Sequence, residues 1–250
     1  MTLNEDLIQT LLPGKILAVQ VGLSRTAVLA ETDDGIRCGV AATLSNPEFE
    51  HHRQPAVRSA GHLHEMLPID LASLIESPSF TEVAIGLATI NALLPRNPEQ
   101  WVDLNAEDYL MQHGVNKNVA VIGHFPFIDR LKLAVKKLWV LELKPKEGDL
   151  PAQAAPEIIP QADLVAITAT TLINKTFQGL IDLCRAEAEV LLIGPSTPLS
   201  PILYDYGIDI LSGTIVSDPK ATITGIGQGI SLKQLQEAGI VRLVTLKKGR

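Results

Sequence analysis

The stretch VAVIGHFPFIDRLKLAVKKLWVLEL, residues 119–143, decides the fold class of this chain. It begins and ends with short apolar runs, which are typical of strands buried on both faces of a sheet. Between these runs, Ile128, Leu131 and Val135 recur at helical spacing, and charged residues take the opposite side. The stretch therefore predicts a strand, a crossover helix and a second, parallel strand.

Similar apolar runs recur along the second half of the chain. They lie at Val119–Ile122, Leu138–Leu143, Leu164–Ala169, Val190–Ile193, Ile208–Leu211 and Val241–Leu246. This pattern predicts a Rossmann-like domain over residues 101–250, with a mostly parallel sheet and helices on both faces. Residues 144–156, which are rich in proline and charge, are predicted to form a surface loop.

The first hundred residues have a different pattern. β-Prone runs at 15–21 and 26–31, with turn residues at 33–35, predict an antiparallel meander. Residues 80–94, FTEVAIGLATINALL, are apolar on nearly every face and predict a helix buried on both sides, between two domains. We therefore expect an α+β domain over residues 1–100, which makes the whole chain a two-domain α/β protein.

Composition argues against several classes of protein. Of the 250 residues, 46% are hydrophobic and 20% are charged, as in ordinary globular proteins. A net charge of −7, with 21 basic residues spread along the chain, argues against nucleic acid as a partner. The N-terminus and the apolar runs predict neither secretion nor a membrane span, and the distant Cys38 and Cys184 do not indicate a disulfide framework. We expect a cytoplasmic protein, and a homo-oligomer stays open.

Candidate site residues follow the first two strands of the Rossmann-like half, because ligands of parallel sheets bind beyond the carboxyl ends of strands. Gly123 permits close backbone approach, His124 is a candidate acid or base, and Phe125 follows in the same turn. Glu142 closes the second strand, where related folds bind a ribose hydroxyl. The turn is not GxGxxG, so a dinucleotide site lacks its main support. A solvated histidine and a plain strand-end carboxylate are the alternatives.

Hydroxyl-bearing loops follow the third and fourth strands. Thr170, Thr171 and Asn174 lie where one helix cap suffices, so the two threonines are predicted to be spare for a ligand. The fourth strand is followed by Gly194, Pro195, Ser196 and Thr197. Because Ser200 and the next proline already supply a cap and a first turn, the two hydroxyl groups of that loop are predicted to hold a polar ligand.

Two polar features stand out in the N-terminal half. Asn91 lies within the buried helix, so its amide is predicted to bond to a backbone carbonyl across the domain interface or to a ligand. Four histidines at short spacing could hold a transition metal, but no cysteine or carboxylate completes a known pattern, and an exposed loop is favoured. These residues are His51, His52, His62 and His64.

Four segments, taken in this order, resemble one family. They are Gly86–Ala92, Gly123–Pro126, Thr170–Thr176 and Gly194–Leu199. The family is the putative heavy-metal chelation domain family, a group of unknown function, and the resemblance covers nearly the whole chain. It implies an enolase N-terminal-like domain before the Rossmann-like one, with residues of both lining a cleft for siderophore-, pterin- or flavin-like molecules, or for metal chelation. Its second domain is similar to methyltransferases, but the glycine-rich turn of an S-adenosylmethionine site is not evident here, so the cofactor stays open.

Two functions therefore remain. The first is a binding or chelation protein that holds a small, polar, metal-complexing ligand in an interdomain cleft. The second is an enzyme of condensation, hydrolysis or group transfer that uses His124 as acid or base and Glu142 to orient the substrate or cofactor.

Overall fold

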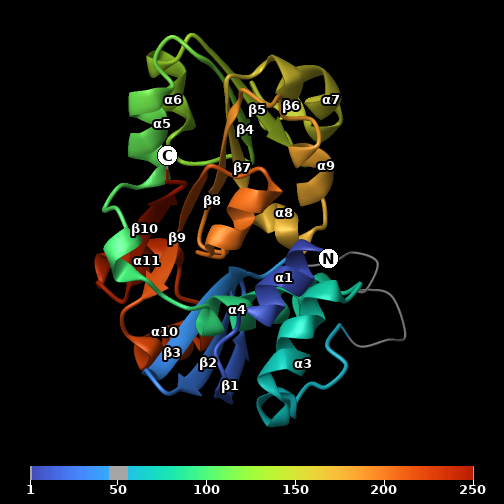
Figure 1. Cartoon of the computed structure of the whole chain (residues 1–250), viewed down its shortest axis with the longest axis vertical. Coiled ribbons are helices and arrows are strands. Elements are labelled where there is room, and N and C mark those ends of the chain that lie inside the picture. Colours follow the sequence, from blue (N-terminus) through green and yellow to red (C-terminus); the bar gives the residue numbers. More distant parts are fainter. Residues whose placement is uncertain (1, 45–55, 250) are drawn as a thin grey trace.

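The computed structural model describes residues 2–44 and 56–249, and within these residues two sheets form the framework (Figure 1). The first is an antiparallel sheet of β1 (Lys15–Val21), β2 (Arg25–Thr32) and β3 (Gly35–Ala42). The second is a larger sheet in the order β10-β9-β8-β7-β4-β5-β6, in which every neighbouring pair is parallel except β9 and β10. Its strands are β4 (Asn118–Ile122), β5 (Lys137–Glu142), β6 (Leu150–Pro151), β7 (Leu164–Thr168), β8 (Glu189–Ile193), β9 (Ile210–Val216) and β10 (Val241–Lys247).

Most helices are short. The α-helices are α1 (Leu3–Gln9), α3 (Pro68–Ala72), α4 (Phe80–Leu93), α5 (Ala106–His113), α6 (Ile128–Ala134), α7 (Ala155–Ile158), α8 (Thr170–Ile173), α9 (Phe177–Ile181), α10 (Pro219–Gly227) and α11 (Leu232–Glu237). Segments of 3-10 helix include Ser73–Glu76, Ala152–Ala154 and Pro201–Tyr206. No helix in the described ranges is long and apolar enough to cross a membrane.

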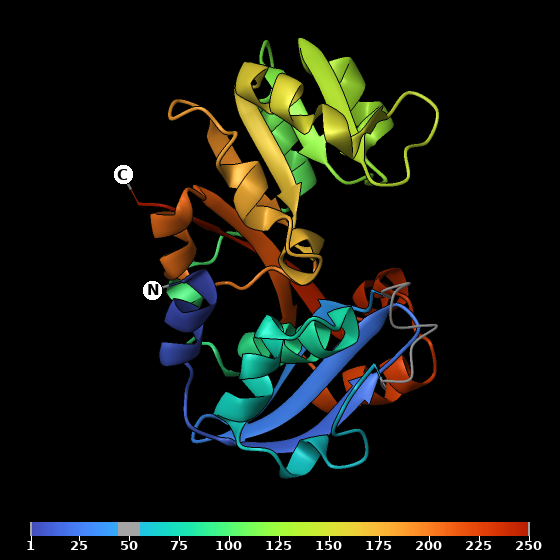
Figure 2. The ribbon, with the colours of Figure 1, turned by 90° about the vertical axis from the view of Figure 1, so that its right-hand side faces the viewer.

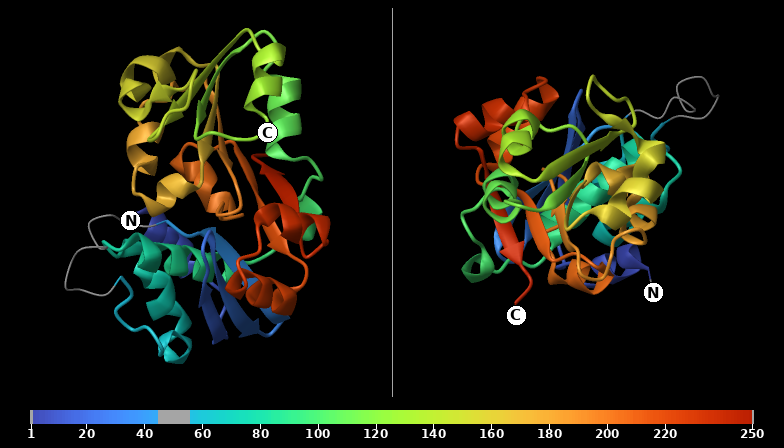
Figure 3. Two further views of the ribbon diagram at one scale, coloured as in Figure 1. Left: turned by 180° about the vertical axis from the view of Figure 1, so that it is seen from behind. Right: turned by 90° about the horizontal axis from the view of Figure 1, so that it is seen from above.

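Helices cover both faces of the larger sheet because successive strand residues point to opposite sides. Val119 and Val121 belong to the apolar cluster that includes α5 and α6. Ala120 and Ile122 belong to the cluster that includes α7, α8 and α9. Figure 3 shows the two helical layers on opposite sides of the sheet. The predicted strand, helix and parallel strand of residues 119–143 are confirmed as β4, α6 and β5.

The order of strands reverses between β4 and β7. From β4 the sheet continues through β5 and β6 on one side, and from β7 it continues through β8 and β9 on the other. Loops that leave the carboxyl ends of two such strands diverge, so they leave a crevice beyond the strand ends. The topology therefore singles out one place on this sheet for a ligand.

Helix α4 lies at the centre of the molecule, and its predicted burial is confirmed. It ends at Leu93, two residues before Pro95, and most of its side chains are buried against β2, β3 and α8. A Cβ at Gly39 of β3 would lie 2.1 Å from Ala88 O, so only glycine permits this close contact between helix and sheet. The helix thus joins the antiparallel sheet to the Rossmann-like half.

The last part of the chain returns to the antiparallel sheet. Helix α10 packs against all three of its strands, and the apolar cluster there combines Leu29 and Val40 with Ile226, Leu235 and Val241. In Figure 2 the red C-terminal helices lie beside the blue strands. Residues that the sequence assigns to the second domain therefore complete the core around the first, and a boundary between residues 100 and 101 stays a prediction.

Three local predictions need correction. The fifth predicted strand, 208–211, is β9 (Ile210–Val216), whose polar Ser212 and Thr214 hide its true length from an apolar pattern. The predicted loop 144–156 contains the edge strand β6, where the missing N–H of Pro151 is tolerated. The side chain of Ser200 makes no capping hydrogen bond to the turn that follows it.

Candidate functional site

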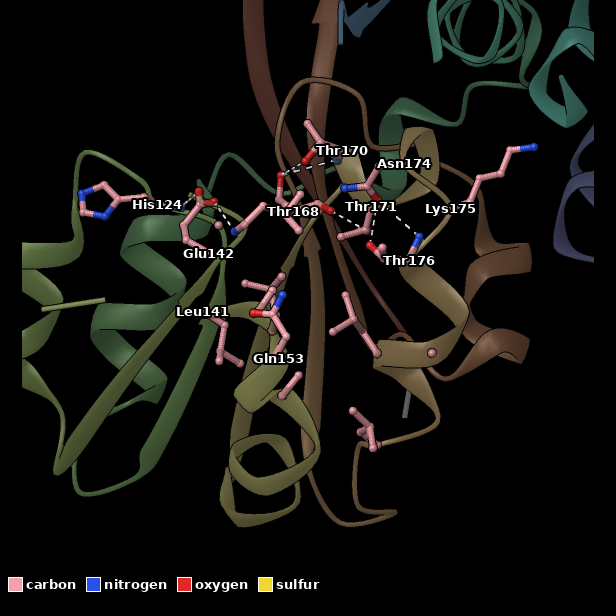
Figure 4. Close-up of a pocket in the computed structure, with 18 of the residues that line it drawn as sticks. His124, Leu141, Glu142, Gln153, Thr168, Thr170, Thr171, Asn174, Lys175 and Thr176 are labelled. Carbon is pink, nitrogen blue, oxygen red and sulfur yellow. Dashed lines mark hydrogen bonds between the residues drawn. The ribbon is translucent and has the colours of Figure 1, made fainter. Parts of the chain in front are cut away.

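A cavity with a volume of about 780 Å³ lies beyond the ends of β4, β5 and β7 (Figure 4). This is the place at which the strand order reverses. Predicted site residues that line it are Gly123, His124, Phe125, Glu142, Thr170, Thr171 and Asn174. All of the lining residues lie between 122 and 183, so the cavity belongs to the Rossmann-like half and not to the interdomain cleft that the sequence predicted. The divergence of the β4 and β7 loops creates it, and no part of the first sheet is needed.

Glu142 forms one end of the cavity. Its Oε1 accepts a hydrogen bond of 2.9 Å from the backbone N–H of His124, and its Oε2 accepts one of 2.9 Å from that of Leu143. The carboxylate therefore ties the end of β5 to the turn after β4. A carboxylate has about four lone-pair positions, so each oxygen can accept a further bond from a ligand. Gly123, with φ at 104°, supplies the backbone bend that brings this turn close.

A polar wall forms the opposite end. The hydroxyls of Thr168 and Thr170 lie 3.0 Å apart, and Asn174 Oδ1 accepts hydrogen bonds from the N–H and the hydroxyl of Thr176. Because Oδ1 is held in this way, the amide nitrogen of Asn174 is the part directed toward the threonines in Figure 4. The floor between the two ends is apolar, with Ile122, Leu141, Leu180 and Leu183.

The two predicted threonines differ in how their hydroxyls are bonded. Both threonines line the cavity, but the hydroxyl of Thr171 donates to Thr168 O at 2.7 Å and the residue is only 2% exposed. Its hydroxyl is therefore used to close the turn between β7 and α8. Thr170 keeps more capacity, since its hydroxyl meets another hydroxyl that can donate or accept.

The sequence reading missed Asp149, Gln153 and Lys175. Asp149 Oδ2 lies 3.0 Å from His124 Nδ1, and the aspartate side chain is only 3% exposed. Gln153 projects between the two walls of the cavity in Figure 4. Lys175, at φ 61°, turns its ammonium group away from the cavity to donate to Glu76 O at 3.1 Å. No pattern pointed to Asp149, because 25 residues separate it from the histidine that it contacts.

The remaining predicted residues lie outside this cavity, where the loop after β8 contacts β3 and α4. Ser196 Oγ accepts a 2.8 Å hydrogen bond from Ala42 N–H of β3, so the hydroxyl predicted to be spare is used inside the protein. Asn91 Nδ2 donates to Val40 O at 2.9 Å and to Ser196 O at 3.1 Å, which is the predicted bond across the interface. The others in this region are Gly194, whose φ is 112°, Pro195 and the buried Thr197.

Neither cysteine has the properties of a nucleophile. Burial raises the pKa of the Cys184 thiol to about 11 and that of the Cys38 thiol to about 12. Both thiols are therefore protonated at neutral pH, and the thiolate is the reactive form.

Comparison with known proteins gives the family. A model described as "Putative heavy-metal chelation" matches residues 105–245, and a second model with the same description matches residues 4–94. This chain belongs to the heavy-metal chelation family. The predicted resemblance is therefore confirmed.

Relatives in the heavy-metal chelation family share the whole fold. A structure from Desulfitobacterium hafniense, a family protein of unknown function, is 25% identical with a TM-score of 0.80, covering 98% of this chain and 97% of that one. A second structure of unknown function, from Pyrococcus horikoshii, is 20% identical with a TM-score of 0.84 and covers 98% of both chains. An uncharacterized protein of Methanocaldococcus jannaschii is 24% identical over an alignment of 215 residues that covers 82% of this chain and 80% of that protein. The α/β fold class is confirmed.

The family description prompts a test of the donor groups against a metal ion. Among the described residues, no group of three or more His, Cys, Asp or Glu side chains could hold one. The cavity lies wholly within the described residues, so its side chains do not form a metal centre of their own. His62 pairs with Glu65 at 3.3 Å, while His51 and His52 lie outside the described residues.

Proposed function

We propose that this member of the heavy-metal chelation family binds a small amphipathic metabolite in the cavity between the ends of β4 and β7. The observation that carries the proposal is that Glu142 and Asn174 line the same cavity, on either side of its apolar floor, where the strand order reverses. The volume of about 780 Å³ is typical of pockets for small molecules.

The two ends of the cavity favour different chemical groups. Glu142 offers only acceptors, so it favours hydroxyl or amino groups of a ligand. The amide nitrogen of Asn174 and the hydroxyls beside it favour a carbonyl, carboxylate or phosphate oxygen. Leu141 and its apolar neighbours favour a flat, weakly polar body between these ends. Pterin-, flavin- and catechol-like molecules combine these features.

In this proposal a heavy metal enters with the ligand. The donor atoms that chelate it belong to the small molecule, since the cavity side chains do not fit a metal centre of their own. The protein then recognises the organic part of a chelate, and the same site accepts the metal-free molecule. Binding of such a chelate would account for the metal chelation named in the family's description without a metal site made of protein side chains.

Binding can be tested with three probes: a pterin, riboflavin and a ferric catecholate. We expect at least one of them to raise the unfolding temperature and to bind in calorimetry. Glu142→Gln then weakens that binding by about tenfold or more, since it removes a charged acceptor.

Asp209→Asn is the matched control. Asp209 also accepts a hydrogen bond from a backbone N–H, that of Val190 at 2.9 Å. It lies at the amino ends of β8 and β9, opposite to the strand ends that border the cavity. We expect this variant to bind the probe as the parent does. The proposal is contradicted if none of the three probes raises the unfolding temperature or binds in calorimetry. It is also contradicted if Glu142→Gln and the parent bind the probe with equal affinity.

His124 and Asp149 favour a second candidate, acid–base catalysis on the bound molecule. A carboxylate that fixes Nδ1 of an imidazole leaves Nε2 as the proton acceptor. In Figure 4 the ring lies at the rim, beyond Glu142 as seen from the threonines, so a substrate must extend over Glu142 to reach it. Under this candidate His124→Ala abolishes turnover of the bound probe with little change in affinity. Full turnover in that variant excludes His124 as the acid or base.

A further inference from the structure

A second, much smaller cavity lies where the two domains meet. Its volume is about 20 Å³, and its wall includes Asn91 of α4, Thr197 of the loop after β8 and Thr214 of β9. Three separate segments of the chain therefore bring polar side chains to one point. None of these residues lines the large cavity.

Three polar atoms in this wall have no bonding partner in residues 2–44 and 56–249. They are Asn91 Oδ1, Thr197 Oγ1 and Thr214 Oγ1, and all three atoms are buried. Thr197 as a whole is only 2% exposed. A buried polar group without a hydrogen bond costs roughly 1–3 kcal/mol, and three of them around one cavity call for a shared partner.

The orientation of Asn91 decides what this partner is. Its Nδ2 donates to Val40 O and to Ser196 O, and a flipped amide would place Oδ1 against both carbonyl oxygens. Oδ1 is therefore a buried acceptor without a partner, on a residue that lines the cavity. An anion cannot donate a hydrogen bond to this oxygen, so it leaves Oδ1 unsatisfied even beside the guanidinium of Arg96, which also lines the wall. That half-buried guanidinium repels a cation.

A neutral molecule that both donates and accepts satisfies all three atoms. It can donate to Asn91 Oδ1, and each threonine hydroxyl can donate to it or accept from it. Roughly 10–15 Å³ is enough for one water molecule, and buried waters make about three hydrogen bonds. The cavity therefore has the size and the groups for one water.

We propose that a single water molecule binds here and bridges Asn91, Thr197 and Thr214. It fastens the central helix of the N-terminal domain to the loop after β8 and to strand β9. The loop that resembled a ligand site in the sequence thus has a structural role, in which Ser196 and the water act side by side. This inference is independent of the proposed function, because the two cavities share no residue.

A crystal structure of the full chain, at a resolution that shows waters, tests the proposal directly. We expect one density peak within hydrogen-bond distance of the three atoms, and no anomalous peak there after a soak in sodium bromide. An anomalous bromide peak identifies an anion and overturns the proposal. Absence of any peak overturns it as well.

Equilibrium unfolding supplies a second test. Thr197→Val and Thr214→Val keep the shape of the side chain, and each should raise the unfolding constant about tenfold. Because both hydroxyls share one water, the double variant should raise it far less than about a hundredfold.

Thr222→Val is the control. The hydroxyl of Thr222 donates to Asp218 O at 2.8 Å, away from this cavity, so its effect should multiply with that of Thr197→Val. If the double variant Thr197→Val, Thr214→Val raises the unfolding constant by the product of the two single effects, the shared water is contradicted.

Discussion

The turn after β4 and the loop after β8 look alike in sequence and have opposite roles in the structure. Each begins with a glycine of positive φ, Gly123 at 104° and Gly194 at 112°, directly after a buried parallel strand. The first opens onto a cavity of about 780 Å³, whereas the second is packed against β3 and α4. The hydroxyl of Ser196 accepts a hydrogen bond from the backbone N–H of Ala42 in β3.

The difference comes from the position of each strand in the sheet. β4 lies where the strand order reverses, so the loops after β4 and β7 diverge and leave a cavity between them. β8 lies on the side of the sheet where β9 contacts β3, and its loop bonds to Ala42 of β3 and Asn91 of α4. Spare polar groups after a strand therefore indicate a ligand only where topology keeps their surroundings open.

The two asparagines give the largest expected contrast. Asn91→Ala leaves the carbonyls of Val40 and Ser196 without their partner, so we expect a loss of about 3 kcal/mol in the free energy of unfolding. Asn174→Ala should cost less than about 1 kcal/mol, while it weakens binding of the responding probe about fivefold. Urea unfolding and calorimetry measure both quantities, and equal stability losses would remove the distinction between the two regions.

The hydroxyl groups should differ in the same direction by a smaller amount. Ser196→Ala leaves the N–H of Ala42 buried without an acceptor and should cost about 2 kcal/mol, with unchanged probe affinity. Thr170→Val should change stability by less than about 0.5 kcal/mol and lower the affinity. If the Ser196→Ala variant keeps full stability but fails to bind the probe, this loop belongs to the ligand site after all.

The smallest expected effect concerns Asp163 at the amino ends of β4 and β7, far from the strand ends that border the cavity, and appears at low pH. The backbone N–H of Asn118 holds the pKa of Asp163 below its ordinary value, aided by Arg185 and opposed by partial burial. The unfolded chain thus binds this proton more readily, so the contribution of Asp163 is complete above the ordinary carboxyl pKa and is lost as pH falls below it. Asp163→Asn should flatten the loss of stability on acidification and leave probe affinity unchanged. An acid unfolding curve identical to that of the parent contradicts this role.

Much of the fold follows from local patterns. The runs at 119–122 and 138–143 with the periodic segment between them correspond to β4, α6 and β5, and the apolar segment 80–94 is the buried helix α4. Strand β6 was missed because two residues, one of them a proline, carry no periodic signal. The packing of α10 on the first sheet was missed because a contact across so much of the sequence leaves no local pattern.

The candidate site was predictable where the strand ends alone determine it. Gly123, Glu142, Thr170 and Asn174 line the same cavity because parallel strands end at one edge of a sheet. Asp149 and Gln153 were not predictable, since they belong to a segment without a regular pattern that returns to β5.

The amino-acid sequence by itself determined the α/β class, the parallel order of strand and helix, and the family. These depend on periodicity and turn chemistry, which act over a few residues. Only the tertiary structure decided which strand-end loop stays open and which becomes an interface. That choice depends on the order of strands and on the return of the chain from β9 to the first sheet, which are set by the packing of segments far apart in the sequence.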